Sequence, residues 1–192
     1  MLKILIVDDA PERRRALQLA LAAVPGVKVA CVVESAREIL DRVNEHRPDV
    51  VLIDTTSPSR DVLEQLGVVS STAPRPVVIF AEDGSTETIR DALKAGVSAY
   101  IVDGIAPGRL DAVMRVAIER FTTDQELRTQ LAATRGELAD RKVIERAKGL
   151  IMKQRKVSEE EAFKALRDLA MQRGKKIGEI ARQVIDAATL LG

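Results

Sequence analysis

Residue types that carry metal and redox chemistry are scarce in this 192-residue sequence. It has one cysteine, one histidine and no tryptophan, and aromatic residues make up only 2% of the chain. The single Cys31 excludes an internal disulfide, and one His with one Cys leaves no metal cluster of the His/Cys kind. We therefore expect a protein of a reducing cytoplasm that requires no cofactor.

Long hydrophobic runs are absent too. No stretch of about 18 or more consecutive apolar residues occurs, so the sequence predicts no helix that crosses a membrane. We expect no signal peptide, because the apolar segment Leu2–Val7 runs directly into Asp8 and Asp9. Hydrophobic residues at 46% and charged residues at 31% are typical of a soluble globular protein of one or two domains.

The net charge is close to zero, but the two signs are unevenly distributed. The whole chain carries +1, whereas residues 141–192 hold 13 Lys and Arg against 7 Asp and Glu, a net charge of +6. Residues 1–140 therefore carry −5. A compact basic end is typical of a nucleic-acid-binding module, although charge alone leaves a solvated helical surface as an equal alternative.

Strand and helix signals alternate over residues 1–106. Apolar runs predict strands. Between them, Pro, Gly and capping residues mark the ends of predicted helices, and Ser35 and Glu38 are predicted to form a capping box. The predicted strands are Leu2–Val7, Val27–Val33, Val50–Asp54, Pro76–Ala81 and Ala99–Val102, and the predicted helices are Pro11–Val24, Ser35–Arg47, Asp61–Ser71 and Thr86–Ala95. This order predicts the α/β class, with a doubly wound, five-stranded parallel sheet.

Acidic residues follow the strands at the edge where ligands bind in such a sheet. Asp8 and Asp9 come after the first strand and Asp54 ends the third, so these carboxylates could hold Mg²⁺. The segments IVDD and DTTSPSRD resemble the receiver domain of two-component response regulators, over about residues 1–120. The resemblance implies that the paired acids hold Mg²⁺ and that Asp54 accepts a phosphoryl group.

Two positions depart from the receiver pattern. Ala81 stands where the family keeps a Thr or Ser, and Asp103 stands where it keeps a Lys. The missing hydroxyl and ammonium would have recognised the phosphoryl oxygens, and Asp103 adds a carboxylate that repels them. We therefore predict a receiver fold that ordinary aspartyl phosphorylation does not control. A phosphorylation-dependent regulator is the alternative.

A long helix is predicted to follow the receiver-like domain. It begins at Pro107, and neither Pro nor Gly occurs between Arg109 and Arg135. Leu127, Leu131 and Leu138 form an apolar seam with polar residues between them, which predicts a coiled coil and a homodimer. Packing of this seam on the receiver-like domain is the alternative.

Three helices are predicted at the basic end. The first carries the stripe Ile144–Ile151, and the second begins at the capping box of Ser158 and Glu161 and ends at Gly174. A third helix follows Lys175 and Lys176. We expect Phe163 to lie in the small core because it has helical spacing with Leu166 and Ala170. This core is too small to be stable without the long helix that precedes it.

The runs IERAKGLIM, SEEEAFKALRDLAM and KKIGEIA closely resemble the ANTAR domain, the RNA-binding module of bacterial transcription antitermination regulators. The chain then divides into a receiver-like domain at 1–120, a coiled-coil linker helix at 121–140 and an ANTAR domain at 141–192. Lys148, beside Gly149, is the first candidate for contact with RNA. The other candidate RNA-binding residues are Lys153, Arg155, Arg173, Lys175 and Lys176.

The connecting segments PRPVVIF, AGVSAYIVDGI and IERAKGLIMK resemble the nitrate- and nitrite-assimilation antiterminators of the NasT type. That resemblance implies a non-enzymatic regulator that binds paired hairpins in a leader mRNA and promotes read-through. It also implies control by a nitrate-sensing regulatory protein. A DNA-binding response regulator, with a recognition helix in the major groove, is the competing hypothesis.

Overall fold

The structure, a computed structural model, describes residues 1–102, 104 and 107–191. The chain forms two compact units, Met1–Gln125 and Glu126–Gly192, which we call the N-terminal unit and the C-terminal unit. Asp103, which stands where the receiver family keeps a lysine, lies outside the described residues. In the part of the chain that the structure describes, each helix is too short or too polar to span a bilayer.

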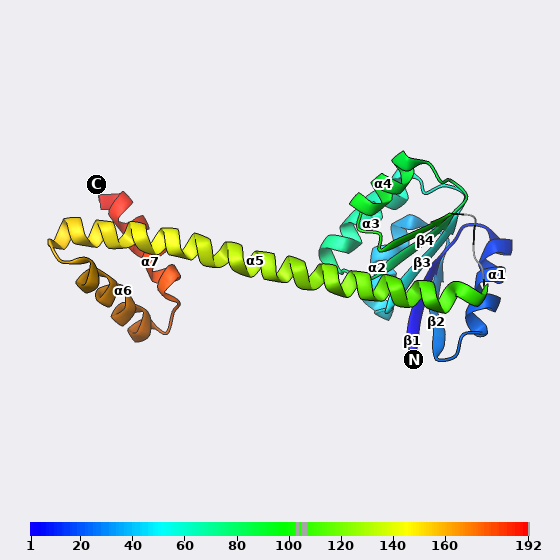
Figure 1. The fold of residues 1–192 in the computed structure, drawn as a ribbon, viewed down its shortest axis with the longest axis horizontal. Coiled ribbons are helices and arrows are strands. Elements are labelled where there is room, and N and C mark those ends of the chain that lie inside the picture. Colours follow the sequence, from blue (N-terminus) through cyan, green and yellow to red (C-terminus); the bar gives the residue numbers. More distant parts are fainter. Residues whose placement is uncertain (103, 105–106, 192) are drawn as a thin grey trace. The chain divides into compact units, whose positions relative to one another are not determined.

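The N-terminal unit is built on a five-stranded parallel sheet in the order β2-β1-β3-β4-β5 (Figure 1). The strands are β1 Leu2–Val7, β2 Val27–Val33, β3 Val50–Thr55, β4 Val77–Ala81 and β5 Ala99–Val102. The predicted doubly wound sheet is confirmed. The sequence marked the inner strands clearly because they are buried on both faces and read as unbroken apolar runs.

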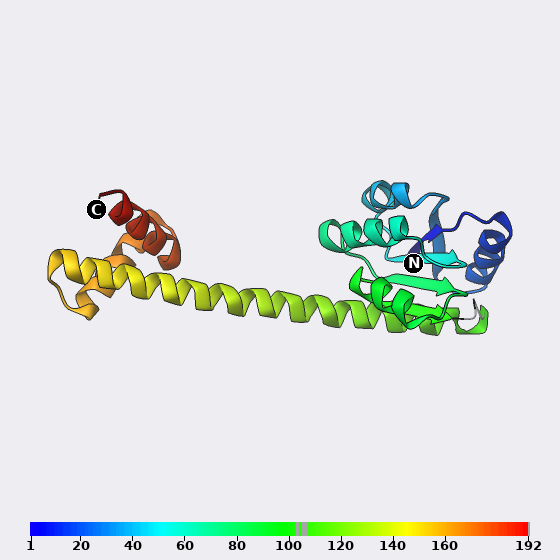
Figure 2. The same cartoon turned by 90° about the horizontal axis from the view of Figure 1, so that it is seen from above.

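Helices cover both faces of the sheet (Figure 2). They are α1 Pro11–Ala22, α2 Ile39–His46, α3 Arg60–Thr72, α4 Thr86–Lys94 and the first part of α5, Leu110–Arg155, with short 3₁₀ turns at η1 Ala36–Glu38 and η2 Pro107–Arg109. Alternate residues of β1 enter two separate cores: Leu5 packs with α2, α3 and α4, and Ile4 packs with α1 and α5.

The predicted capping box of Ser35 and Glu38 is wrong. The Ser35 hydroxyl accepts a bond from the Arg37 amide at 3.3 Å, because the chain first makes the 3₁₀ turn η1. In this tighter turn Glu38 points away from the cap, and its carboxylate pairs with Arg42 at 3.4 Å. The regular helix α2 therefore starts only at Ile39.

The C-terminal unit has three helical segments around one small core. The end of α5 supplies Ala147 and Ile151, and these pack with buried residues of α6, Glu159–Arg173, and α7, Ile177–Leu191. The capping box of Ser158 and Glu161 is confirmed, and Gly174 ends α6 in the left-handed conformation with φ 61°. The end of α5 is therefore part of this core, and the dependence of its stability on the preceding helix stays a prediction.

A close contact joins α7 to α5 at the edge of this core. A Cβ atom placed on Gly178 would lie 2.6 Å from the carboxylate of Asp140, and that carboxylate forms an ion pair with Arg182. A larger residue at position 178 would therefore require the Asp140 side chain to shift away from α7. Asp140 precedes the domain boundary at residue 141 that the sequence motif suggested.

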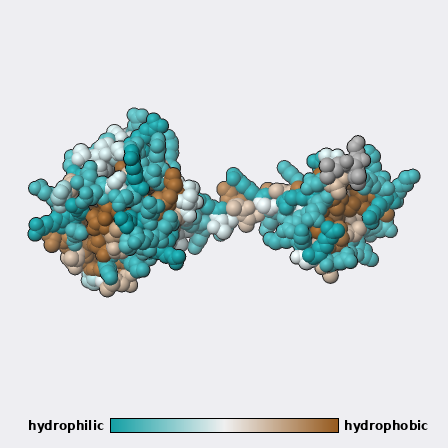
Figure 3. Space-filling view, turned by 180° about the vertical axis from the view of Figure 1, so that it is seen from behind, coloured by the Kyte–Doolittle hydropathy of each residue, from teal (hydrophilic) through white to brown (hydrophobic). Residues whose placement is uncertain are grey.

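Some apolar side chains of the C-terminal unit lie at the surface. Phe163 is 41% exposed and lies outside the core, so its predicted place in the core is wrong. Leu127, Leu131 and Leu138 are 51–58% exposed on α5. Figure 3 shows apolar surface on both units. The predicted coiled coil and dimer remain predictions, because the structure contains one chain.

Candidate acidic pocket and nucleic-acid interface

A cavity of about 140 Å³ lies at the carboxyl ends of β1 and β3. Asp8 follows β1, and Asp54 belongs to β3, so the parallel strands bring both carboxylates to one edge of the sheet. Asp9, Glu34 and Ser57 also line the cavity. The structure therefore brings the three acids named by the sequence analysis to one cavity at this edge of the sheet.

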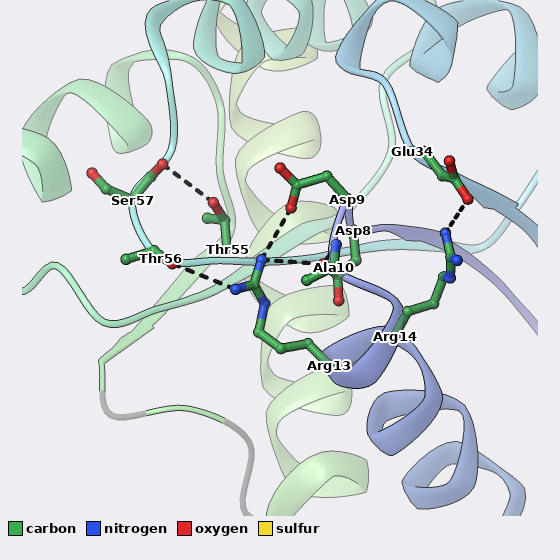
Figure 4. Close-up of polar contacts among 9 residues, drawn as sticks. All are labelled: Asp8, Asp9, Ala10, Arg13, Arg14, Glu34, Thr55, Thr56 and Ser57. Carbon is green, nitrogen blue, oxygen red and sulfur yellow. Dashed lines mark hydrogen bonds and ion pairs between the residues drawn. The ribbon is translucent and has the colours of Figure 1, made fainter.

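An arginine that the sequence analysis missed lies among these acids (Figure 4). The Nη2 atom of Arg13 is 3.3 Å from Oδ1 of Asp8 and 3.0 Å from Oδ1 of Asp9. Its Nη1 atom donates to the Thr56 hydroxyl at 3.4 Å, so Arg13 links the loops that follow β1 and β3. The spacing of four residues between Asp9 and Arg13 was a visible signal for an ion pair.

Some features of the pocket favour the binding of a divalent cation and others oppose it. Oδ2 of Asp8 is buried and has no partner among the described residues, which leaves an acceptor for a ligand. However, Arg13 already binds Oδ1 of both Asp8 and Asp9, and the Asp9 side chain is 79% exposed. Among the described residues, no group of three or more His, Cys, Asp or Glu could hold a metal ion. The pocket therefore suits Mg²⁺ only if Arg13 moves.

Asp54 lies in an environment that disfavours its negative charge. Burial, and then the nearby charge of Asp8, raise its pKa to about 6, while the charge of Arg13 acts in the opposite direction. The carboxylate is still mostly ionised at pH 7, as a phosphoryl acceptor must be. The ionised form of Asp54 is less favourable in the folded protein than in the unfolded chain, so its negative charge at pH 7 lowers the stability of the fold.

The loop after β4 has no side-chain hydroxyl at Ala81 and is held by bonds to Asp83. Ala81 is buried at the end of β4 and offers no polar atom. Two residues further on, Asp83 accepts bonds from the Ser85 amide at 2.9 Å, the Ser57 hydroxyl at 2.9 Å and the Thr88 hydroxyl at 2.8 Å. These bonds, led by that of the Ser85 amide, lower its pKa to about 2.

Asp83 consequently joins the loop after β4 to the loop after β3. Ser57 belongs to the loop after β3, and its hydroxyl is directed to Asp83. The Tyr100 hydroxyl donates to the backbone carbonyl of Asp83 at 2.7 Å, which adds β5 to the same cluster. Sequence reasoning missed this cluster, because its members are separated by up to 43 positions and only folding brings them together.

Lys148 does not lie on the basic surface as expected. It is only 8% exposed, and its Nζ atom is 2.8 Å from Glu145 and 2.6 Å from Glu159. These two carboxylates raise its pKa, bonding to Glu145 being the larger cause. Lys148 thus joins α5 to the first turn of α6, and its charge is already neutralised. This burial does not fit direct contact with RNA.

The other predicted RNA-binding residues are accessible. Gly149 is exposed, and a Cβ atom there would meet no neighbour within 4 Å, so a ligand could approach this part of α5 closely. Arg173 is exposed and donates to Gln183 at 3.2 Å. Four further basic residues are exposed at the end of α5 and in the connection between α6 and α7: Lys153, Arg155, Lys175 and Lys176.

Two family models match the chain, one on each unit. The response regulator receiver domain matches residues 4–115, which is more than half of the chain. The ANTAR domain matches residues 132–185. These ranges agree with the parallel-sheet unit and with the helices that carry the exposed basic residues.

Two kinds of curated protein are similar to this chain. Transcriptional regulatory protein PdtaR of Mycobacterium tuberculosis is 27% identical over 184 residues, which cover 96% of this chain and 89% of that protein. A protein-glutamate methylesterase/protein-glutamine glutaminase of Alkalilimnicola ehrlichii is 32% identical over 121 residues, which cover 60% of this chain and 31% of that protein. The first match therefore extends over both units, and the second covers only part of a longer protein.

Solved structures resemble the N-terminal unit. The response regulator domain of Thermotoga maritima CheB has 25% sequence identity and a TM-score of 0.54, and covers 62% of this chain and 97% of that chain. A CheY-like receiver domain protein of Methanospirillum hungatei has 22% identity and a TM-score of 0.55, covering 65% of this chain and 98% of that chain. The chain therefore belongs to the response regulator receiver family and carries an ANTAR domain in its C-terminal unit.

Proposed function

We propose that this protein is a transcription antitermination regulator that binds RNA through its C-terminal unit. The observation that carries the proposal is the ANTAR match at residues 132–185, joined to a similarity with PdtaR that extends over both units. The exposed basic residues of the same unit support it, because phosphate contacts dominate the affinity of nucleic-acid binders. Both matched families are regulatory, and the proposed activity is binding rather than catalysis.

The proposed ligand is a pair of hairpins in a leader mRNA. Binding would favour the antiterminator form of the transcript, so that the polymerase reads through. The segments IERAKGLIMK and AGVSAYIVDGI, which resemble nitrate- and nitrite-assimilation antiterminators, support a target of that kind. The exposed Lys153 and Arg155 at the end of α5, and Lys175 and Lys176 between α6 and α7, would contact phosphates of the folded RNA.

We propose that a partner protein, rather than aspartyl phosphorylation, controls the receiver domain. Three features of the pocket support this view. Arg13 pairs with Asp8 and Asp9, Ala81 offers no hydroxyl, and the Ser57 hydroxyl is bound to Asp83. A nitrate-sensing regulatory protein is the proposed partner. The alternative is phosphorylation of Asp54, which is present and mostly ionised at pH 7.

Pull-down of the full-length protein from cells, followed by sequencing of the bound RNA, tests the function. We expect enrichment of leader segments with two adjacent hairpins upstream of nitrate or nitrite genes. Lys175→Glu/Lys176→Glu should abolish the enrichment, whereas Lys28→Glu/Lys94→Glu, which changes net charge equally on the N-terminal unit, should retain it. Preferred binding to duplex DNA of the same sequence would favour the DNA-binding alternative.

Control without phosphorylation has its own test. Asp54→Asn removes the acceptor, and we expect the variant to retain RNA binding and signal-dependent read-through in a reporter strain. Circular dichroism would establish that the variant is folded. Loss of read-through in a well-folded Asp54→Asn protein would support phosphorylation as the controlling event.

We also propose a homodimer formed through Leu127, Leu131 and Leu138. These leucines are more than half exposed on α5, and a second copy of the helix would cover them. Leu131→Glu places a charge in this seam and should shift the protein to monomers in sedimentation experiments. Thr129→Glu, which adds the same charge outside the leucine seam, is the matched control. Dimers of unchanged stability in Leu131→Glu would place the interface elsewhere.

A further inference from the structure

Phe163 is the only aromatic residue in residues 141–192, and its ring is not used by the core. The buried side of α6 is formed by Ala162, Leu166 and Ala170, with Leu169 partly buried beside them. Phe163 lies on the flank of this stripe and is 41% exposed. The exposed ring therefore offers a flat apolar face on which a ligand could stack.

The residues near Phe163 on the same side of α6 have the character of a nucleic-acid contact. Arg167 is one helical turn after Phe163, and Met171, which is 75% exposed, follows one turn later. The side chains of Arg167 and Lys164 make no ion pair or hydrogen bond with any other described residue. In contrast to Lys148, their charges are available to a ligand. Glu160 and Asp168 are also exposed on α6, so this part of the surface carries charges of both signs.

We propose that Phe163 stacks on an unpaired base of the bound RNA, with Arg167 on the adjoining phosphate. The proposal rests on RNA binding as the function of the C-terminal unit. Proteins that recognise RNA loops stack splayed bases on aromatic rings and guanidinium planes, and each such stack contributes to affinity without reference to the base identity. A ring near two cations that have no ion-pair partner among the described residues fits this ligand better than a protein helix, which needs a longer apolar groove.

This assignment divides the RNA surface into two kinds of contact. Lys153, Arg155, Lys175 and Lys176 hold the phosphates of the stem, and their contribution falls with rising salt concentration. Phe163 contacts an unpaired base of the loop. Its contribution to the binding affinity changes little with salt concentration, because stacking releases no counterions. The protein would then distinguish a stem with a loop from a fully paired duplex.

The probes are a pool of RNAs with two adjacent stem–loops, which share constant stems and carry randomised loops, and the same stems as blunt duplexes. Phe163→Leu keeps an apolar side chain but removes the ring, and Phe163→Trp keeps a ring. With full-length protein, we expect Phe163→Leu to bind the loops selected by wild type about 10- to 100-fold more weakly. Binding of the blunt duplexes should not change, and Phe163→Trp should retain binding of the loops.

The salt dependence of RNA binding distinguishes the contribution of Phe163 from that of Arg167. We expect Phe163→Leu to leave the slope of log K against log salt unchanged, and Arg167→Gln to reduce it by about one unit. Equal binding of the selected loops by wild type and Phe163→Leu would overturn the stacking assignment and leave this face for a protein partner. Absence of binding by wild type to any RNA in the pool would overturn the proposed function itself.

Discussion

Among the residues that the structure describes, each unit buries one charged side chain, which is an acid in the N-terminal unit and a base in the C-terminal unit. In the N-terminal unit, Asp8 is 2% exposed and pairs with Arg13. In the C-terminal unit, Lys148 is 8% exposed and pairs with Glu145 and Glu159. Both residues belong to motifs that the sequence analysis assigned to ligand binding. In both cases the chain supplies the opposite charge itself.

The two pairs differ in how completely the buried charge is satisfied. Lys148 has two carboxylate partners at 2.8 Å and 2.6 Å, whereas Asp8 has one guanidinium at 3.3 Å and retains an oxygen without a partner. Lys148 therefore has the features of a structural link between helices. The Asp8 pocket keeps an unsatisfied acceptor and so is the place where a ligand or a partner could still act.

The largest effect is expected when the charge of Lys148 is reversed. Lys148→Glu would place a third carboxylate against Glu145 and Glu159, and we expect the C-terminal unit to lose its cooperative unfolding transition while the N-terminal unit stays folded. Hydrogen exchange, followed separately for the two units, measures the effect. Glu159→Lys added to Lys148→Glu should restore part of the protection. Unchanged exchange in the single variant would show that the link is unimportant.

A smaller effect is expected when Arg13 is removed. Removing one partner of a buried pair costs roughly 3–5 kcal/mol, and we expect about 2 kcal/mol for Arg13→Gln because that side chain is partly exposed. Arg14→Gln is the matched control, since Arg14 pairs with the exposed Glu34 and should cost less than about 1 kcal/mol. Urea denaturation compares the two. Equal losses would show that Arg13 is an ordinary surface residue.

Arg13→Gln also tests whether the acidic pocket binds a divalent cation. If Arg13 occupies the place of Mg²⁺, millimolar Mg²⁺ should stabilise Arg13→Gln more than wild type. Calorimetric titration should then detect binding only to the variant. Binding of Mg²⁺ to wild type with the same affinity would show that the pocket accepts the cation beside Arg13.

Asp54 should make stability depend on pH. Its pKa is raised to about 6 in the fold, so the folded state binds more protons than the unfolded state between about pH 4 and 6. Stability should fall as pH rises through this window. Asp54→Asn should therefore equal wild type below about pH 4 and be more stable above pH 6, by about 1 kcal/mol after allowance for solvent screening. A pH-independent difference in urea denaturation would contradict this cause.

The smallest expected difference concerns the two serine caps. Ser158 and Glu161 bond reciprocally at the start of α6, so Ser158→Ala should cost about 1 kcal/mol in the C-terminal unit. Ser35 accepts one long bond at the start of a 3₁₀ turn, so Ser35→Ala should cost about half as much. Thermal unfolding measured for each unit would show the order, and a larger loss at Ser35 would reverse it.

Local patterns predicted most of the fold. The runs at β1 and β3 were recognised because strands buried on both faces are apolar throughout. The cap at Ser158 was found because its two partners are three residues apart. The cap at Ser35 was misread, because the same spacing occurs where the backbone forms a 3₁₀ turn.

The site was harder to predict because adjacent helical positions differ in burial. Ala162 is buried and Phe163 is exposed, while on α5 Lys148 is buried and Gly149 is exposed. Helical periodicity locates an apolar stripe but leaves its edges uncertain by one position. The partners of Arg13 and Asp83 depend on which loops meet at the sheet edge, and no local pattern contains that information.

The close approach of Asp140 to Gly178 limits how the RNA-binding module can be excised or grafted. A fragment cut at residue 141 would lose the carboxylate that pairs with Arg182, and would expose the new chain terminus beside the first turn of α7. A chimaera that joins this module to another receiver should therefore keep the native chain from before Asp140. The choice of the joining residue then decides whether α7 is anchored to the helix that precedes it.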